Sequence, residues 1–347
     1  MAIRLIHAGL GGWGTDWELN ALPPVREIER VAWVDSHEPT LAKARERLDL
    51  PEDRCFMTLR DACEAVEADA VLITAPMVAH VPLAIEALEA GKHVLVEKPL
   101  AGTVEEAQTA VDLAAERGLT LMVSQQYRHY PAPRKVEQLL AEEAFGPVST
   151  VRVDFRKYSN RAKKGTSRHY VFPHPLIYDM AIHHFDLMRM LLKREPVRVF
   201  AQVMDPPWSK FNDEASAAIT IVFDGGTVVS YRGSWVSTGA PTHWAGDWHL
   251  ECETGEVFFT SREGGDVGDK SDIVRVHPLE GQPGEEPLDR MPLHGRSAGL
   301  VAFARAITEG TEPETSGREN LGSLALMVAA AKSAESGQVE DVVDPYA

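Results

Sequence analysis

Two groups of residues in this chain have side chains and spacing suited to proton transfer at a hydroxyl group. The first is Lys98, which follows the apolar run 93–96 and precedes Pro99. This order places an ammonium group at the carboxyl end of a predicted parallel strand, where ligands of doubly wound sheets bind. A surface ion pair with Glu97 is the alternative interpretation of Lys98. The position at a strand end favours the ligand-facing interpretation.

The second group is Asp179 and His183, in a segment with helical periodicity over 176–192. Residues four apart share a helix face, so Asp186 is expected on the same face and His184 is expected to point away. A carboxylate one turn before an imidazole can fix its tautomer and adjust its pKa, as a general base requires. The pair predicts a proton acceptor, and a hydrogen-bonded core histidine is the alternative.

A glycine-rich turn near the start of the chain predicts where a dinucleotide binds. It follows the apolar run 2–7 and consists of Gly9, Leu10, Gly11, Gly12, Trp13 and Gly14. In this GxGxxG spacing, Gly9 makes a tight turn, Gly11 lets the backbone approach a pyrophosphate, and Gly14 lets the next helix pack closely. Glycine-rich hairpins share the pattern, so a second signal is needed.

That second signal is Asp35, at the end of a strand predicted over 31–35. Its carboxylate is placed to accept hydrogen bonds from the adenosine ribose, and its charge repels a 2'-phosphate. We therefore predict NAD rather than NADP as the cofactor. Ser36 is included among the predicted cofactor-binding residues, and together with His37 it is expected to moderate this preference.

The order of the remaining patterns predicts two domains. Short apolar runs alternate with helical patterns over 1–123, among them 81–90 and 104–117. This alternation predicts an NAD-binding α/β Rossmann domain with a doubly wound parallel sheet. Over 124–347 we predict an α+β substrate-binding and oligomerisation domain with an open, mostly antiparallel sheet and helices on one side. Asp224, Gly225 and Gly226 predict a tight hairpin. The predicted strands of this domain cover 148–158, 197–203, 215–223, 227–236, 248–260 and 273–278, and its helices 176–192, 297–309 and 318–336.

Composition limits the classes of partner. The 347-residue chain has a formal net charge of −17, which argues against nucleic acid and anionic membranes, because both are bound through many Lys and Arg contacts. The three cysteines suggest neither a disulfide framework nor a zinc site. The absence of a leader pattern or of an apolar run of membrane-spanning length predicts a cytoplasmic protein without a membrane partner.

A segment rich in basic and aromatic residues, 156–174, precedes the predicted catalytic helix and is expected to cover a substrate. An acidic sugar, or a glycoside stacked on Tyr170, Trp235 or Trp244, suits it. A solvated loop or a subunit contact is the equal alternative. The candidate substrate residues are Tyr127, Arg161, Lys164, His169, Tyr170 and Trp235. A zinc or iron site built from His169, His174, His183, His184 and Asp186 matches no metal-binding spacing, and we predict no metal.

Taken in order, these motifs resemble the glucose-fructose oxidoreductase and inositol dehydrogenase (Gfo/Idh/MocA) family. The resemblance rests on the glycine turn, the segment 74–80 (TAPMVAH), the triplet 97–99 (EKP), the segment 126–128 (QYR) and the Asp179/His183 pair. The chain departs from the family in having Ala75 where Thr is usual, Met77 where Asn is frequent, and Ala181 where Gly is common. It also has Pro173, His174 and Pro175 in place of a glycine-rich approach to the helix. These departures leave every catalytic group in place.

The resemblance implies a sugar or polyol dehydrogenase that forms a homodimer or homotetramer through the sheet of its second domain. It implies that Lys98 hydrogen-bonds the reacting hydroxyl, that His183 takes its proton, and that Asp179 orients substrate and base. It also implies a cis peptide bond at Lys98–Pro99. The residues that it places along the cofactor are Ala75, Pro76, His80, Glu97, Lys98 and Gln126.

Two other functions are compatible with the same residues. One is a hydrolase or epimerase that keeps its NAD bound and uses transient oxidation to weaken a neighbouring bond. The other is a non-catalytic regulator that senses the cofactor, against which the retention of Lys98, Asp179 and His183 argues.

Overall fold

The structure is a computed structural model that describes residues 2–164, 168–263 and 271–346. The chain divides into two compact units. The first comprises Met1–Gln126 and Gly295–Leu324, and the second comprises Tyr127–His294 and Ala325–Ala347. The segment Gly295–Leu324, which the sequence patterns assign to the second domain, therefore groups by its contacts with the first unit.

The first unit contains a parallel sheet of six strands in the order β3-β2-β1-β4-β5-β6. This is the predicted doubly wound arrangement, and the strand order reverses between β1 and β4, which is where such sheets bind ligands. The apolar runs become strands because both faces of the sheet are covered. The strands are β1 (Ile3–Ala8), β2 (Ile28–Val34), β3 (Cys55–Phe56), β4 (Ala70–Ile73), β5 (His93–Val96) and β6 (Leu121–Val123).

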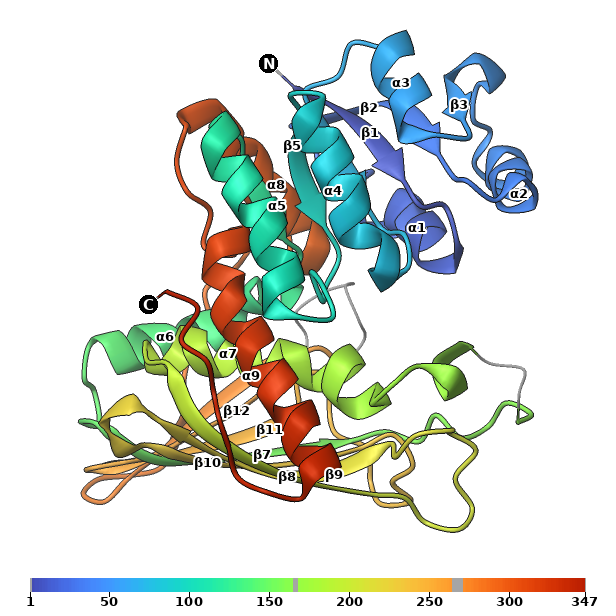
Figure 1. The fold of residues 1–347 in the computed structure, drawn as a ribbon. Coiled ribbons are helices and arrows are strands. Elements are labelled where there is room, and N and C mark those ends of the chain that lie inside the picture. The colour runs from blue at the N-terminus through green and yellow to red at the C-terminus, as the bar shows by residue number, and fades with distance from the viewer. Residues whose placement is uncertain (1, 165–167, 264–270, 347) are drawn as a thin grey trace. The chain divides into compact units, whose positions relative to one another are not determined.

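Helices flank this sheet. Helix α4 packs against β4 and β5, and α8 contacts β2 and η1. Figure 1 shows α4 between α3 and α5. Helix α5 covers the predicted range 104–117, because Thr103 caps its start by accepting from the N–H of Glu106 and Gly118 ends it with φ +63°. The helices are α1 (Gly12–Asp16), the π-helix η1 (Trp17–Ala21), α2 (Glu38–Leu48), η2 (Glu52–Arg54), α3 (Leu59–Ala65), η3 (Met77–Ala79), α4 (His80–Glu89), α5 (Val104–Arg117), η4 (Gln126–Arg128) at the boundary, and α8 (Gly295–Glu309).

The second unit contains a sheet of nine strands in the order β14-β13-β12-β11-β7-β10-β9-β8-β15. All its pairs are antiparallel except β7 with β10, which confirms a mostly antiparallel sheet. The strands are β7 (Val148–Arg156), β8 (Pro196–Met204), β9 (Ser216–Phe223), β10 (Val228–Ser234), β11 (Asp247–Cys252), β12 (Gly255–Thr260), β13 (Ile273–Pro278), β14 (Gly284–Glu285) and β15 (Glu340–Asp341).

Two features of this sheet depend on turns. The predicted hairpin at 224–226 is confirmed, with positive φ at Gly225 and Gly226 between β9 and β10. The prediction of one strand over 248–260 is wrong, because the chain reverses at Glu253 and Thr254 and forms the hairpin of β11 and β12. The hydrophobic alternation continues across that turn, so the pattern alone hides it.

Helices lie on one face of the nine-stranded sheet, as Figure 1 shows for α6 and α7. Helix α6 contacts β12 and β13, and η6 contacts β9 and β10. The single helix predicted over 176–192 is a π-helix followed by an α-helix. The helices are α6 (Pro131–Ala141), η5 (Arg168–Val171), the π-helix η6 (Pro175–Ala181), α7 (Ile182–Leu192) and α9 (Gly317–Ser336), whose residues from Ala325 onward belong to this unit. Within the described ranges, no helix is both long and apolar enough to cross a membrane.

Candidate functional site

The glycine turn after β1 has two positions that exclude any side chain. Gly9 has φ +101°, and a Cβ there would lie 2.4 Å from the backbone nitrogen of Ala75. A Cβ at Gly14 would lie 1.8 Å from the carbonyl oxygen of Gly9. These distances are far below van der Waals contact, so both glycines are required for the turn to pack against the end of β4.

The other two glycines of the turn leave space for a ligand. A Cβ at Gly11 or Gly12 would meet no atom of the described residues within 4 Å. Gly11 is the N-cap of α1, without a side-chain cap, and the first N–H groups of a helix have no partner within it. An open approach and unpaired N–H donors at a helix N-terminus suit a pyrophosphate.

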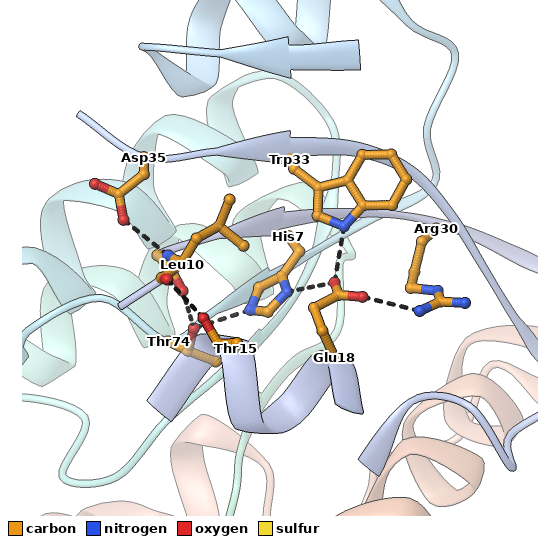
Figure 2. A network of polar contacts seen from close by, with 9 residues as sticks. His7, Leu10, Thr15, Glu18, Arg30, Trp33, Asp35 and Thr74 are labelled. Atoms are coloured by element: carbon orange, nitrogen blue, oxygen red, sulfur yellow. Dashed lines mark hydrogen bonds and ion pairs between the residues drawn. The ribbon is translucent and has the colours of Figure 1, made fainter. Parts of the chain in front are cut away.

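Asp35 is held in place by the backbone on both sides. Its two carboxylate oxygens accept hydrogen bonds from the N–H of Leu10, in the glycine turn, at 2.8 Å and from the N–H of His37 at 2.9 Å. Figure 2 shows the contact with Leu10. The side chain is partly exposed, as is required of a group that accepts from a ribose, and the neighbouring Ser36 is exposed.

Glu97 anchors the segment after the glycine turn to the end of β5. Its Oε1 accepts from the indole N–H groups of Trp13 and Trp17, each at 2.8 Å. Trp13 remains 44% exposed, and the guanidinium of Arg296 lies 4.3 Å from its ring centre. The carboxylate of Glu97 therefore holds the two tryptophans at the end of β5. The ring of Trp13 remains partly exposed to solvent beside the glycine turn.

The Lys98–Pro99 peptide bond is cis, as predicted, and Lys98 is half-buried. His80 is buried and ties two loops together, since its ring nitrogens lie 2.8 Å from the carbonyl oxygen of Pro99 and 2.9 Å from that of Ala75. Burial lowers the pKa of His80, although the two carbonyl contacts oppose this shift. His80 therefore fixes the loops of Ala75 and Pro99, while Pro76 is exposed beside them.

The side chain of Gln126 contains a buried acceptor that no described residue satisfies. Its Oε1 is buried and has no hydrogen-bond partner within residues 2–164, 168–263 and 271–346. A buried acceptor without a partner costs free energy, which a ligand hydroxyl would restore. With the open sides of Gly11 and Gly12 and the anchored carboxylate of Asp35, the first unit has the features required to bind a dinucleotide.

In the second unit, His183 stacks on Tyr127. The ring centres are 4.2 Å apart and the planes differ by 3°. The guanidinium carbon of Arg262 lies 4.2 Å from the centre of the same Tyr127 ring. His183 is buried, and this stack holds the plane of its imidazole.

The polar neighbours of His183 on its helix have separate partners. Asp179 lies in the π-helical segment, and its Oδ2 lies 3.2 Å from Nε2 of His169. His184 is fully buried, and its ring nitrogens lie 3.1 Å from the Tyr231 hydroxyl and 3.3 Å from the carbonyl oxygen of Trp244. Burial lowers the pKa of His184 to about 4, so it is a neutral core histidine at neutral pH.

Asp186 also has a structural role. It forms a bidentate ion pair with Arg128, at 2.6 and 2.8 Å, and both side chains are buried. This pair ties the start of α7 to the QYR segment that contains Tyr127. No group of three or more His, Cys, Asp or Glu residues suited to a metal ion occurs in the described part of the chain.

The candidate substrate residues differ in exposure. Tyr170 is buried with its hydroxyl donating to the carbonyl oxygens of Ser159 and Ala162, and Trp235 is buried with its indole N–H donating to the carbonyl oxygen of Pro175. Both rings are almost fully buried, and the stacking role for them stays a prediction.

The basic segment is only partly available to a substrate. Arg161 and Lys164 are exposed. Arg156 lies 3.4 Å from Asp154, and Lys157 lies 4.7 Å from the centre of the Trp244 ring, with its pKa lowered by burial. Residues 165–167 of this segment lie outside the described residues.

The sequence patterns did not predict two of the contacts that the structure shows. Arg262 stacks on Tyr127 from a segment without any recognisable motif. His7 and Glu18 form a buried polar pair behind the glycine turn. A histidine inside an apolar strand is the one signal in the sequence that points to this pair.

Comparisons with known proteins agree with the geometry. Residues 3–125 match the family model described as "Oxidoreductase family, NAD-binding Rossmann fold", and residues 134–257 match the "GFO/IDH/MocA C-terminal domain". The chain belongs to the Gfo/Idh/MocA oxidoreductase family. Its members are NAD(P)-dependent oxidoreductases, so the predicted family and fold class are confirmed.

Individual relatives span most or all of the chain. Uncharacterized protein y4oX of Sinorhizobium fredii is 28% identical, with 100% of this chain and 98% of that protein covered. The 1,5-anhydro-D-fructose reductase of Ensifer adhaerens is 26% identical, with 80% of each covered. The crystal structure of an aldose-aldose oxidoreductase from Caulobacter crescentus complexed with glycerol has a TM-score of 0.85 at 21% identity. The similarity covers 98% of the present chain and 100% of the aldose-aldose oxidoreductase chain, and it shows a common fold.

Proposed function

We propose that this protein is an NAD-dependent oxidoreductase that acts on a secondary hydroxyl of a sugar, polyol or glycoside. The observation that carries the proposal is the glycine turn joined by a hydrogen bond to the carboxylate of Asp35. Two relatives whose names refer to sugars, the anhydrofructose reductase and the aldose-aldose oxidoreductase, support the substrate class. Asp35 favours NAD, because a carboxylate at this position repels a 2'-phosphate.

Each residue of the proposed chemistry has a distinct role. Lys98 donates a hydrogen bond to the reacting hydroxyl and stabilises the developing alkoxide. His183 accepts the hydroxyl proton, and the stack on Tyr127 fixes the plane of its imidazole. The bound nicotinamide supplies the hydride acceptor, so the alcohol loses one proton and one hydride.

Asp179 is proposed to orient substrate and base. Its carboxylate oxygen Oδ2 lies 3.2 Å from Nε2 of His169, which places it beside that ring. The ring of His169 packs edge-on against two aromatic rings, with centre-to-centre distances of 5.1 Å to Phe211 and 4.8 Å to Trp235. The sugar is therefore proposed to meet a fixed carboxylate and imidazole, and the exposed Arg161 and Lys164 favour an acidic sugar.

A screen of neutral sugars, uronates and inositols for NADH fluorescence tests this function. Lys98→Ala and His183→Ala are each expected to lower kcat/KM on the best substrate by about a hundredfold or more. NADH binding is expected to remain. The matched controls are Lys43→Ala and His277→Ala, both at exposed positions, which should retain wild-type rates. Full activity of a Lys98→Ala/His183→Ala enzyme would refute the roles, and a lower KM for NADPH than for NADH would refute the cofactor preference.

The same screen distinguishes net oxidation of the substrate from chemistry in which the substrate is oxidised only transiently. An enzyme that oxidises its substrate only transiently forms product without accumulating NADH, so product analysis beside the fluorescence trace distinguishes a hydrolase or epimerase. Turnover of either kind excludes a purely cofactor-sensing regulator.

We also propose that the protein forms a homodimer or homotetramer through the second unit's sheet. Helices α6 and α7 lie on one face of that sheet, and its opposite face carries exposed side chains on adjacent strands, including Arg152, Ser230, Thr220 and Phe200. Sedimentation equilibrium measures the assembly, and a monomer at micromolar concentration would contradict it.

A further inference from the structure

A buried polar network lies directly behind the glycine turn (Figure 2). His7 of β1 is 0% exposed and Glu18 of η1 is 3% exposed. The Nδ1 of His7 lies 2.7 Å from Oε1 of Glu18, and its Nε2 lies 2.9 Å from the hydroxyl of Thr74, the residue after β4. Both ring nitrogens of one buried histidine are therefore engaged.

Glu18 is an acceptor only. Besides His7, it accepts hydrogen bonds from the indole N–H of Trp33 and the guanidinium of Arg30, each at 2.9 Å. Burial alone would raise the pKa of Glu18, but the hydrogen bonds and charges of His7 and Arg30 outweigh burial and lower it. Glu18 is therefore a carboxylate at neutral pH.

The hydroxyl proton of Thr74 can be donated to only one of its two neighbours. Its hydroxyl lies 2.5 Å from the carbonyl oxygen of Gly9, and a carbonyl can only accept, so Thr74 donates to Gly9. With that single proton used, the contact between Thr74 and Nε2 of His7 requires a proton on Nε2. The carboxylate of Glu18 requires a second proton on Nδ1. This set of hydrogen bonds is complete only when His7 is an imidazolium.

Loss of one proton from His7 changes what Thr74 can do. The remaining ring proton stays on Nδ1, because a hydrogen bond to a carboxylate is stronger than one to a hydroxyl. Nε2 then becomes an acceptor and competes with the Gly9 carbonyl for the hydroxyl proton of Thr74. The peptide between Gly9 and Leu10 is held at its carbonyl by Thr74 and at its N–H by Asp35. Deprotonation of His7 therefore loosens the peptide that positions Asp35.

We propose that His7 is a positioning residue for the dinucleotide, and that its protonation, relayed by Thr74 to the Gly9 carbonyl, tightens cofactor binding. This inference rests on the proposed function, since it concerns the same cofactor. The charged groups that the structure places against His7 and its partners are Glu18 and Arg30, and the nearby Asp16 is paired with Arg296 at 2.5 Å.

The test is the dissociation constant of NADH, measured by fluorescence at about pH 6 and about pH 9. The wild type is expected to bind roughly threefold to tenfold more weakly at the higher pH, which corresponds to the loss of one hydrogen bond to the turn. In His7→Leu/Glu18→Leu, Thr74 has no competitor for its proton, so the ratio of the two constants should fall to about one.

Thr74→Val provides a second variant of nearly the same shape. It should bind NADH weakly at both pH values, again with a ratio near one, whereas Thr74→Ser should restore the wild-type ratio. Circular dichroism checks that each variant is folded. A ratio of the two dissociation constants near one in the wild type would overturn the role of His7. The same conclusion would follow if His7→Leu/Glu18→Leu and Thr74→Val kept the wild-type ratio. A wild type that binds neither NADH nor NADPH at any pH would instead overturn the proposed function.

Discussion

The two units each contain a buried carboxylate, and the pKa values of these two groups move in opposite directions. Glu18 in the first unit accepts from an imidazole, a guanidinium and an indole, and its pKa is lowered. Asp272 in the second unit accepts from the N–H of Ala132 at 2.9 Å and the hydroxyl of Ser261 at 2.7 Å. Burial raises the pKa of Asp272, and its hydrogen bonds only reduce that shift.

The difference shows that the charge of the donors, rather than their number, sets the sign of the shift. Each carboxylate accepts three hydrogen bonds, but the donors to Glu18 include the guanidinium of Arg30 and the imidazole of His7, both of which lower its pKa. Asp272 receives neutral donors, the third being the N–H of Arg262 at 3.3 Å. A neutral donor stabilises the anion less than burial destabilises it. Both carboxylates nevertheless lie next to proposed site segments, since Glu18 contacts His7 before the glycine turn and Asp272 holds the backbone N–H of Arg262, whose guanidinium lies at Tyr127.

The largest expected effect comes from breaking the charged centre. Glu18→Leu removes the acceptor of three donors and leaves the buried His7 and the guanidinium of Arg30 without their carboxylate partner. It should therefore lower the free energy of unfolding by about 3 kcal/mol. His7→Leu/Glu18→Leu removes both partners and should cost clearly less. Urea unfolding followed by circular dichroism measures both. Equal losses for the single and double variants would show that His7 and Glu18 are not coupled.

A smaller effect is expected from the cation on Tyr127. Arg262→Met removes a guanidinium 4.2 Å from the ring centre and its hydrogen bond to the Tyr130 hydroxyl at 3.1 Å. The expected cost in the same urea experiment is about 1–2 kcal/mol. Arg275→Met is the matched control, because Arg275 pairs with Glu285 at an exposed edge and such pairs contribute little. A loss for Arg262→Met no larger than the control would show that the stack does not stabilise this unit.

The sequence predicts most strands and the cofactor turn, because those features depend on local patterns. Helix α5 is predicted to the residue, since a capping threonine and a terminal glycine mark its ends. The cis peptide bond at Lys98–Pro99 follows from the resemblance. The hairpin of β11 and β12 is missed because its turn residues, Glu253 and Thr254, are not typical turn formers and the alternation continues through them.

The missed contacts are those that join distant parts of the chain. His7 meets Thr74, which is 67 residues away, and Arg262 meets Tyr130, which is 132 residues away. No periodicity encodes such a pair. The π-helical turn that contains Asp179 is also hidden, because its composition has an ordinary helical period. The sequence therefore predicts the type of site, while the partners of each side chain come from tertiary packing.

The smallest effect is the pH dependence of stability, and it sharpens the contrast between the two carboxylates. The folded pKa of Glu18 is lowered, so its contribution is fully present above the unfolded value of about 4.3 and is lost as the pH falls. The folded pKa of Asp272 is raised, so its contribution is fully present below the unfolded value of about 3.9 and is lost as the pH rises through the folded pKa.

Two difference curves test these signs. Between about pH 6 and about pH 4, the unfolding free energy of the wild type minus that of Glu18→Gln should decrease as the pH falls, because Glu18 takes up a proton in the unfolded chain before it does so in the folded protein. The corresponding difference for Asp272→Asn should increase, because protonation removes the cost of a buried anion that has no cationic donor. Glu280→Gln at an exposed position provides the baseline. If the two differences changed in the same direction, the charge of the donors could not be what separates the two sites.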